Sequence, residues 1–256
     1  MIRKSSLYLL GTSILLGGCT VQATKYGGTM FVPELKDTVF YLNDEYRTGG
    51  SASAILGSYG RILVNETASF ERIGLINNES FKTKIRGIAK IANTTEGLAS
   101  VKIDFKSIAN LEGGEDLKNE EEFKITIHEI VDLDKLESSI NKKRQNNPRV
   151  EFKLKDQNVR VITAVAVIYN HKALSIFSEG IKSELYWNNN SFFEFKGKDG
   201  KNKQLSIGDG VSVAYQFSRL CWSKDGEVVA LVRDRHGHNE CPFGSLLFHP
   251  DYGVSM

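Results

Sequence analysis

The clearest pattern along the chain is a strict alternation of apolar and polar residues in three segments, residues 81–91, 101–105 and 123–131. A period of two, with one apolar and one polar face, is typical of half-buried antiparallel strands. The stretches between them, residues 93–97 and 112–116, are rich in Asn, Thr, Gly and acidic residues, which favour turns. We therefore predict a three-stranded meander in this part of the chain.

One segment, Asp132–Arg144, has helical periodicity instead. Its leucine and isoleucine residues recur at the spacing of one helix face, acidic residues lead it, and three basic residues close it, as the helix dipole favours. Pro148 follows, so we expect the helix to end before it. Residues 150–155 alternate again and are predicted as a strand.

The rest of the chain reads as further strands. Residues 159–168 (VRVITAVAVI) are apolar on both faces and β-branched, which predicts a strand in the middle of a sheet. Hairpins are expected in the last third, one of them around the turn Lys224-Asp225-Gly226. The predicted class is α+β and β-rich, a mostly antiparallel sheet of meander and hairpins with one central helix. The further strands are expected at residues 38–42, 61–66, 192–196, 204–207, 211–223 and 227–233.

The first eighteen residues have the order of a secretory signal peptide: two basic residues, an apolar run from Leu7 to Leu16, then small residues. The sequence Leu16-Gly17-Gly18-Cys19 resembles the bacterial lipobox, over residues 1–19 only. That resemblance implies cleavage before Cys19, a diacylglycerol on its sulfur and an acyl chain on its new amine. Thr20, where Asp usually signals inner-membrane retention, implies anchoring in the outer membrane.

Processing changes the charge of the protein. The chain has 33 Lys and Arg against 31 Asp and Glu, and two of the basic residues lie in the signal. The mature chain is therefore close to neutral and has no global field that would recruit nucleic acid. Several acyl chains anchor a protein firmly to a membrane, and no later segment is apolar for long enough to span one as a helix.

Export also bears on the cysteines. With Cys19 carrying lipid, Cys221 and Cys241 remain, and in an oxidising compartment such as the periplasm an even pair predicts one disulfide bond. Cys221 falls on the apolar side of its predicted strand, so we expect it on the core side. The alternative is two separate buried thiols.

Two features suggest metal chemistry, and both are weak. The sequence around Cys241 holds three of the five histidines, His236, His238 and His249, and imidazole and thiolate groups at short spacing could bind zinc or copper. A disulfide at Cys241 would remove the thiolate, so we expect no metal and no cofactor there. His128-Glu129 begins like a zinc-protease helix, but Asp132 stands where the second histidine is needed, and the segment alternates like a strand.

The polar face of the predicted meander is strongly basic. If the register holds, these residues project to one side and could meet lipid A phosphates, peptidoglycan carboxylates or an acidic protein. The alternative is a solvated face on which lysine discourages edge pairing. The residues concerned are Lys82, Lys84, Arg86, Lys90, Lys102, Lys106 and Lys124.

We therefore expect a signal peptide at 1–18, a tether at 19–36 and a single β-rich domain at 37–256, with a seam conceivable at 132–148. The protein is expected to be an outer-membrane lipoprotein and a non-enzymatic binding or assembly module, held to the membrane through Cys19. Its expected partner is an envelope protein or an anionic envelope polymer. The alternatives are a periplasmic hydrolase acting on envelope polymers and an oligomeric β-hairpin protein that inserts into membranes.

Overall fold

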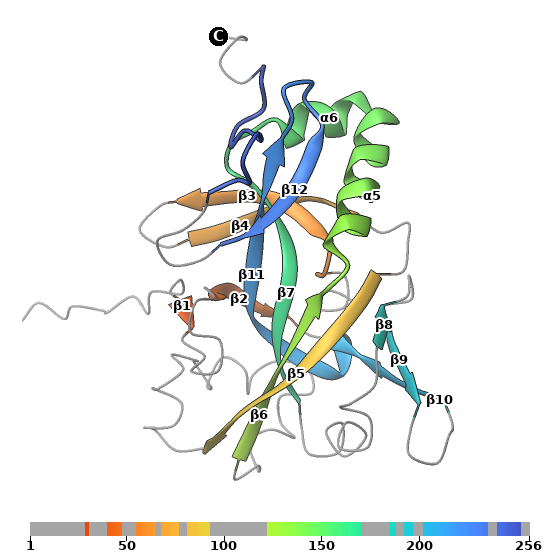
Figure 1. The fold of residues 1–256 in the computed structure, drawn as a ribbon. Coiled ribbons are helices and arrows are strands. Elements are labelled where there is room, and N and C mark those ends of the chain that lie inside the picture. The colour runs from red at the N-terminus through yellow and green to blue at the C-terminus, as the bar shows by residue number, and fades with distance from the viewer. Residues whose placement is uncertain are drawn as a thin grey trace, which may run out of the picture.

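The structure is a computed structural model of the chain. It describes residues 29–30, 40–47, 55–64, 68–76, 81–92, 122–169, 185–187, 192–196, 202–234 and 240–251. In that part, twelve strands form one antiparallel sheet with two α-helices at one end (Figure 1). The predicted class, α+β and β-rich, is confirmed.

The strands are β1 (Thr29–Met30), β2 (Phe40–Arg47), β3 (Ser58–Val64), β4 (Ala68–Leu75), β5 (Phe81–Ala92), β6 (Glu122–Ile130), β7 (Val159–Tyr169), β8 (Leu185–Trp187), β9 (Phe192–Lys196), β10 (Asn202–Ser206), β11 (Gly210–Trp222) and β12 (Val228–Arg233). The helices are α5 (Leu133–Gln145), α6 (Pro148–Leu154) and the short 3-10 helix η2 (Ile207–Asp209).

Two long strands, β7 and β11, pair with each other and form the centre of the sheet. Every residue of β7 is buried, as its double-sided apolar sequence predicts. In β11 every residue except Arg219 is buried. Across this central pair, the enclosed hydroxyls of Thr163 and Ser218 bond to each other at 2.7 Å. These two strands therefore hold the most enclosed part of the fold.

The sheet forks on both sides of this central pair. The first part of β7 pairs with β3 and the last part with β6. Similarly, the first part of β11 pairs with β2 and the last part with β12. The strand order is β1-β2-β11-β7-β6-β5-β8-β9-β10, with the β3–β4 hairpin and β12 as branches.

The order predicted for the meander is wrong. Strands β5 and β6 are hydrogen-bonded directly to each other, so no third strand separates them. The intended middle strand, residues 101–105, lies outside the described residues. The sheet nevertheless runs in sequence from β5 through β6 to β7, and it continues across the conceivable seam at 132–148.

The polar face expected for β6 is also not exposed to solvent. Thr126 and His128 are buried, although both stand at the positions that alternation assigns to solvent. The Nε2 atom of His128 lies 3.1 Å from the hydroxyl of Thr126 and 3.0 Å from that of Tyr169. The contact with Tyr169, 41 positions away, gives Nε2 of His128 a polar partner inside the fold, which is why a polar position can face inward here.

The predicted helix is confirmed as α5. Its N-cap Asp132 accepts a hydrogen bond from the backbone N–H of Lys135, and Leu136 and Ile140 form its buried stripe. Lys142, Lys143 and Arg144 occupy its last turn.

A second helix, α6, replaces the strand expected at residues 150–155. Asn147 caps it by accepting from the backbone N–H groups of Arg149 and Val150, and Pro148 opens its first turn, where a missing N–H costs nothing. Val150 and Leu154 are four residues apart and both buried. The buried residues of this segment are therefore four apart, as in a helix, and not two apart, as in a strand.

At the N-terminal side, β2 and β3 overlap the strands expected at 38–42 and 61–66. Within the segment predicted as a tether, Thr29 and Met30 form the two-residue strand β1, which pairs with β2.

The C-terminal hairpins are confirmed. Strands β9 and β10 pair, as do β11 and β12, the latter pair around a turn in which Gly226 has a φ of +78°. Cys221 is fully buried near the end of β11 and forms a disulfide with Cys241, with 5.7 Å between the Cα atoms. Both predictions for this cysteine are thereby confirmed.

Reduction of this disulfide should lower the free energy of unfolding by about 3 kcal/mol, because the bond closes a loop over a sequence separation of 20 residues in the unfolded chain. Urea denaturation followed by circular dichroism, with and without reductant, measures the difference. The Cys241→Ser variant is the control and should match the reduced protein whether or not reductant is present. Equal stability of the oxidised and reduced proteins would contradict the prediction.

Candidate functional site

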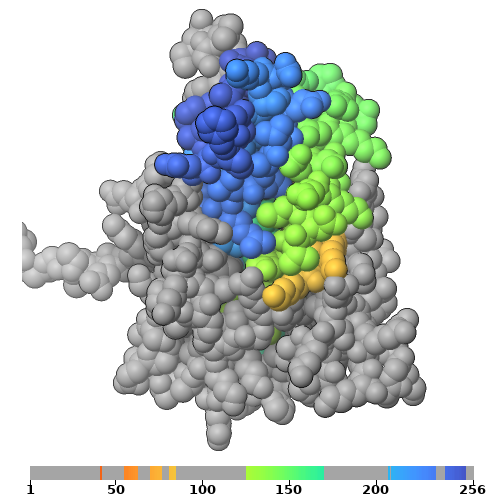
Figure 2. All heavy atoms as spheres, in the orientation of Figure 1, coloured from red at the N-terminus to blue at the C-terminus, as the bar shows by residue number. Residues whose placement is uncertain are grey.

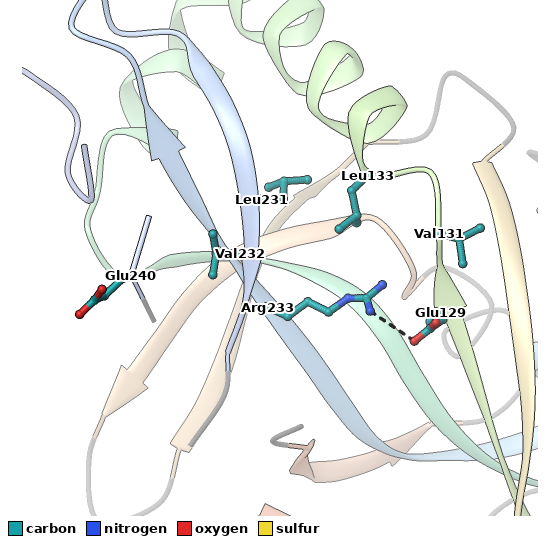
Figure 3. A pocket seen from close by; sticks show the side chains of 7 residues that line it. All are labelled: Glu129, Val131, Leu133, Leu231, Val232, Arg233 and Glu240. Atoms are coloured by element: carbon teal, nitrogen blue, oxygen red, sulfur yellow. Dashed lines mark ion pairs between the residues drawn. The ribbon is translucent and has the colours of Figure 1, made fainter. Parts of the chain in front are cut away.

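A groove of about 610 Å³ lies between the end of β6, the start of α5 and the strand β12 (Figure 3). Four of its seven lining residues are aliphatic and three are charged. In the space-filling view, the green residues of the region that includes α5 lie next to the blue residues of the region that includes β12 (Figure 2). The lining residues are Glu129, Val131, Leu133, Leu231, Val232, Arg233 and Glu240.

Two walls of the groove follow from the alternation of side chains along a strand, in which residues two apart point to the same side. Along the end of β6, Glu129 and Val131 are two residues apart and turn to the same side. Leu231 and Arg233 do the same along β12. The chain then leaves β6 for α5, and this change of direction leaves Val131 39% exposed at the rim.

An ion pair spans the groove. Arg233 approaches Glu129 with 3.5 Å between Nη1 and Oε2, and its Nη2 donates to the carbonyl oxygen of Ile130 at 3.0 Å. Because the Glu129 side chain is buried, removing its partner would leave a carboxylate in a low-dielectric place. The pair therefore fixes the width of the groove at this point (Figure 3).

Helix α5 is fastened to β12 by side chains. The Asn141 amide donates to the carbonyl oxygen of Val228 at 2.7 Å and accepts from the N–H of the same residue at 3.0 Å. Arg144 donates to the carbonyl oxygen of Gly226 at 2.6 Å. Asn141 thus takes the place of a neighbouring strand at the start of β12, and the groove walls are held in place before any ligand arrives.

A second charged cluster lies buried near the other edge of β12. The carboxylate of Asp234 is 3.7 Å from Nε of Arg160, and both residues are buried. Burial raises the pKa of Asp234 and lowers that of Arg160. Burial, with Asp234 nearby, also raises the pKa of Tyr41. Arg160 also donates to the carbonyl oxygens of its neighbours Gln157 and Val159, and its ion pair with Asp234 joins the start of β7 to the end of β12.

Beyond the disulfide, residues 241–251 form a segment that we call the strap. It is bonded to β11 by the disulfide of Cys241 and by two backbone hydrogen bonds between Leu246 and Trp222, of 2.8 and 2.7 Å. Its last part is held by His249, which packs edge-on against Trp222 with 4.7 Å between ring centroids. The strap is therefore fixed at three points along its length.

The His249 ring is buried, and one of its nitrogens accepts a hydrogen bond from the backbone. Its Nδ1 accepts the backbone N–H of Asp251 at 3.1 Å, which leaves the proton on Nε2, the nitrogen that faces Gly226. Burial lowers its pKa, and so do the nearby cations of Lys155 and Arg144. The carboxylates of Asp251 and Glu151 oppose this effect.

These contacts make His249 a packing residue in this structure, and the other two candidate ligands, His236 and His238, lie outside the described residues. Among the described residues, no group of three or more His, Cys, Asp or Glu side chains is arranged to hold a metal ion. His128 sits on a strand, as expected, and lies against Tyr169.

Of the predicted basic face, Lys84 is exposed and Lys82 is partly buried. Lys102 and Lys106 lie outside the described residues, and so do the side chains of Arg86, Lys90 and Lys124. That these residues bind an anionic partner stays a prediction.

The register does not keep these positions on one side of the sheet. Lys84 pairs with Glu129, but the ladder shifts before Lys90, which then pairs with Lys124. Position 124 shares the face of Thr126, opposite to that of Glu129. The assumption of a single basic face is therefore wrong for the described strands.

The groove was not predicted, because its lining comes from two chain segments about 100 residues apart. The one local signal was Val131, an apolar residue at the end of an alternating strand, which was expected in the core. Comparison with known proteins adds no guide: no protein-family model and no curated protein matches the sequence. Among the described residues, no helix is long and apolar enough to span a membrane.

Lowering the pH from 7 to 5 should reduce the free energy of unfolding by about 2 kcal/mol through His128 alone. Burial lowers the pKa of His128 from 6.5 to about 3, so below pH 6.5 the unfolded chain binds a proton that the folded chain excludes. Stability is therefore lost as the pH falls through 6.5. The lowered pKa of His249 adds to the loss in the same direction.

Urea titrations at several pH values measure this slope. The His128→Gln variant should be less stable at pH 7. Between pH 7 and 5, however, its free energy of unfolding should fall by about 2 kcal/mol less than that of the parent protein. His249→Asn, which keeps an acceptor for Asp251, should also flatten the curve. Slopes unchanged in both variants would contradict the assignment.

Proposed function

We propose that this protein is an exported lipoprotein, anchored in the outer membrane through Cys19, whose β-rich domain is a non-enzymatic binding or assembly module. The proposal assigns the groove between β6, α5 and β12 as the place where an apolar segment of an envelope protein binds. The observation that carries the binding role is the groove itself, an open cleft of about 610 Å³ lined by four aliphatic and three charged residues, with walls fastened to each other.

Two further observations support this proposal. The disulfide between Cys221 and Cys241 is of the kind that persists in oxidising compartments, which fits export. The lipobox-like sequence ends at Cys19, ahead of the first described strand at Thr29. Export and anchoring thus rest on the sequence, and the binding role on the groove.

The lining of the groove favours binding over hydrolysis. Hydrolysis of a glycosidic bond usually needs two carboxyl groups that face the scissile bond. Here Glu129 is held by Arg233, and Figure 3 shows Glu240 pointing away from both. The aliphatic residues between them offer desolvation and shape, which are the main contributions to recognising an apolar segment.

Native protein extracted from membranes should begin at Cys19 and carry three acyl chains. Intact-mass and peptide mass spectrometry would measure the lack of residues 1–18 and the added lipid mass. The Cys19→Ala variant should remain unprocessed and unlipidated. A native protein that keeps its first eighteen residues would contradict the anchoring part of the proposal.

Partner binding should depend on the groove rim. A photo-crosslinking amino acid at position 131 should give one discrete adduct in intact envelopes, and the same group at position 229 should give none. Val131 and Val229 are a matched pair, 39% and 42% exposed, and only Val131 lines the groove.

Val131→Lys should then weaken partner binding about tenfold or more, because burying a valine contributes about 1.5 kcal/mol or more. Val229→Lys should change binding little. The groove assignment fails if the two variants bind the crosslinked partner equally well, even where the lipid anchor is established.

A further inference from the structure

The strap carries an unusual share of exposed apolar surface. Six large apolar residues are exposed in the described part of the chain. Three of them belong to the strap and fall within a stretch of six consecutive residues, 243–248. Phe243 is fully exposed, Phe248 is 42% exposed and Leu246 is 36% exposed. Clustered exposed apolar residues in a soluble domain commonly mark a surface that contacts a protein or a membrane.

The exposed ring of Phe243 sits on a fixed turn. Ser245 donates to the carbonyl oxygen of Pro242 with its N–H at 3.0 Å and its hydroxyl at 2.6 Å, and Gly244 supplies a φ of +86°. The disulfide holds the turn on one side and the Leu246–Trp222 pair on the other. The fold thus holds a phenylalanine in water at a place where a polar residue would fit equally well.

At Leu246, the strap offers no strand edge for recognition by hydrogen bonds. Both backbone groups of Leu246 are already bonded to Trp222, so this residue has no free strand edge to present. A partner would meet aromatic and aliphatic groups and a tight turn. This chemistry suits the interfacial zone of a bilayer, where aromatic side chains are favoured and no directional bond is needed.

The position of the strap is compatible with the lipid anchor. In the sheet register Thr29 pairs with Tyr41, which pairs with Tyr215, and Trp222 lies seven residues further along β11. At usual strand spacings, Leu246 is therefore about 28 Å from Thr29. The chain from Cys19 to Thr29 can span at most about 34 Å.

We propose that the strap is a second membrane contact, in which Phe243, with Leu246 and Phe248, enters the interface of the bilayer that holds the acyl chains on Cys19. This inference rests on the proposed lipid anchor for its biological setting. The acyl chains hold the protein at the membrane, and the strap sets which side of the domain faces the lipid. A lipid anchor on a tether alone fixes distance but not orientation.

The strap can be tested without acyl chains. The mature chain with Cys19→Ser is mixed with 100-nm vesicles of phosphatidylethanolamine and phosphatidylglycerol, and the bound fraction is measured by flotation. We expect weak binding that falls about tenfold in Phe243→Ser, since burying a phenylalanine contributes about 1.5 kcal/mol or more. Phe152→Ser is the matched control, because Phe152 is 73% exposed on α6, outside the strap, and this variant should bind like the parent.

A second measurement reports insertion directly. Phe243→Trp should show a blue-shifted emission on vesicle binding and quenching by lipids brominated on their acyl chains, in a background with Trp187→Phe to remove one of the two native tryptophans. Trp222 is buried in the folded protein and provides an unchanging signal. Circular dichroism of each variant in solution checks that it is folded.

Three outcomes would overturn the proposal. The first is no vesicle binding by the parent chain, and the second is an equal loss in Phe243→Ser and Phe152→Ser, which would indicate general adsorption. The third is crosslinking of position 243 to a protein in envelopes with no quenching by brominated lipid, which would assign the strap to a protein partner. Each leaves the lipid anchor untouched, because the mass of native Cys19 tests the anchor separately.

Discussion

The pairing of β7 with β11 is the constraint on which the rest of the structure depends. Both strands are enclosed on both faces, so their backbone groups must be satisfied by neighbouring strands, and the hydroxyls of Thr163 and Ser218 bond to each other between them. Each strand has two different partners along its outer side, and the sheet therefore forks at both edges. Helix α5 packs against β12, one of these branches, and the groove lies between that branch and the end of β6.

Local features of this fold could be predicted from the sequence because local residues determine them. The apolar run of β7 can only be a fully covered strand, and the charge order of α5 matches its dipole and cap. The turn at Gly226 and the inward side of Cys221 follow from neighbouring residues. The disulfide was predictable once export was inferred, because two cysteines remained for one bond.

Features that depend on distant partners could not be predicted in this way. His128 reads as a solvent-facing residue until Tyr169, 41 positions later, is placed beside it. The lysines of β5 and β6 read as one face until a shift in the ladder moves part of them to the other side. Residues 150–155 alternate, yet Asn147 and Pro148 start a helix whose buried residues are four apart. In each case a contact or a cap outweighed the local period.

The strap and β12 pair with opposite edges of β11, and Glu240, directly before the strap, lines the groove, so the two proposals are linked. Trp222 pairs with Val228 of β12 on one edge and with Leu246 of the strap on the other. A bilayer that contacts Phe243, Leu246 and Phe248 would therefore meet the edge of β11 opposite to β12, with the start of the strap next to the groove. The hairpin turn and the disulfide hold the strap and β12 on these two edges of β11, so lipid contact and partner binding would meet only where the strap begins, next to Glu240. A protein tethered only by a chain of ten residues would present its groove in all directions, whereas one that also rests on the strap would present it in one direction relative to the bilayer.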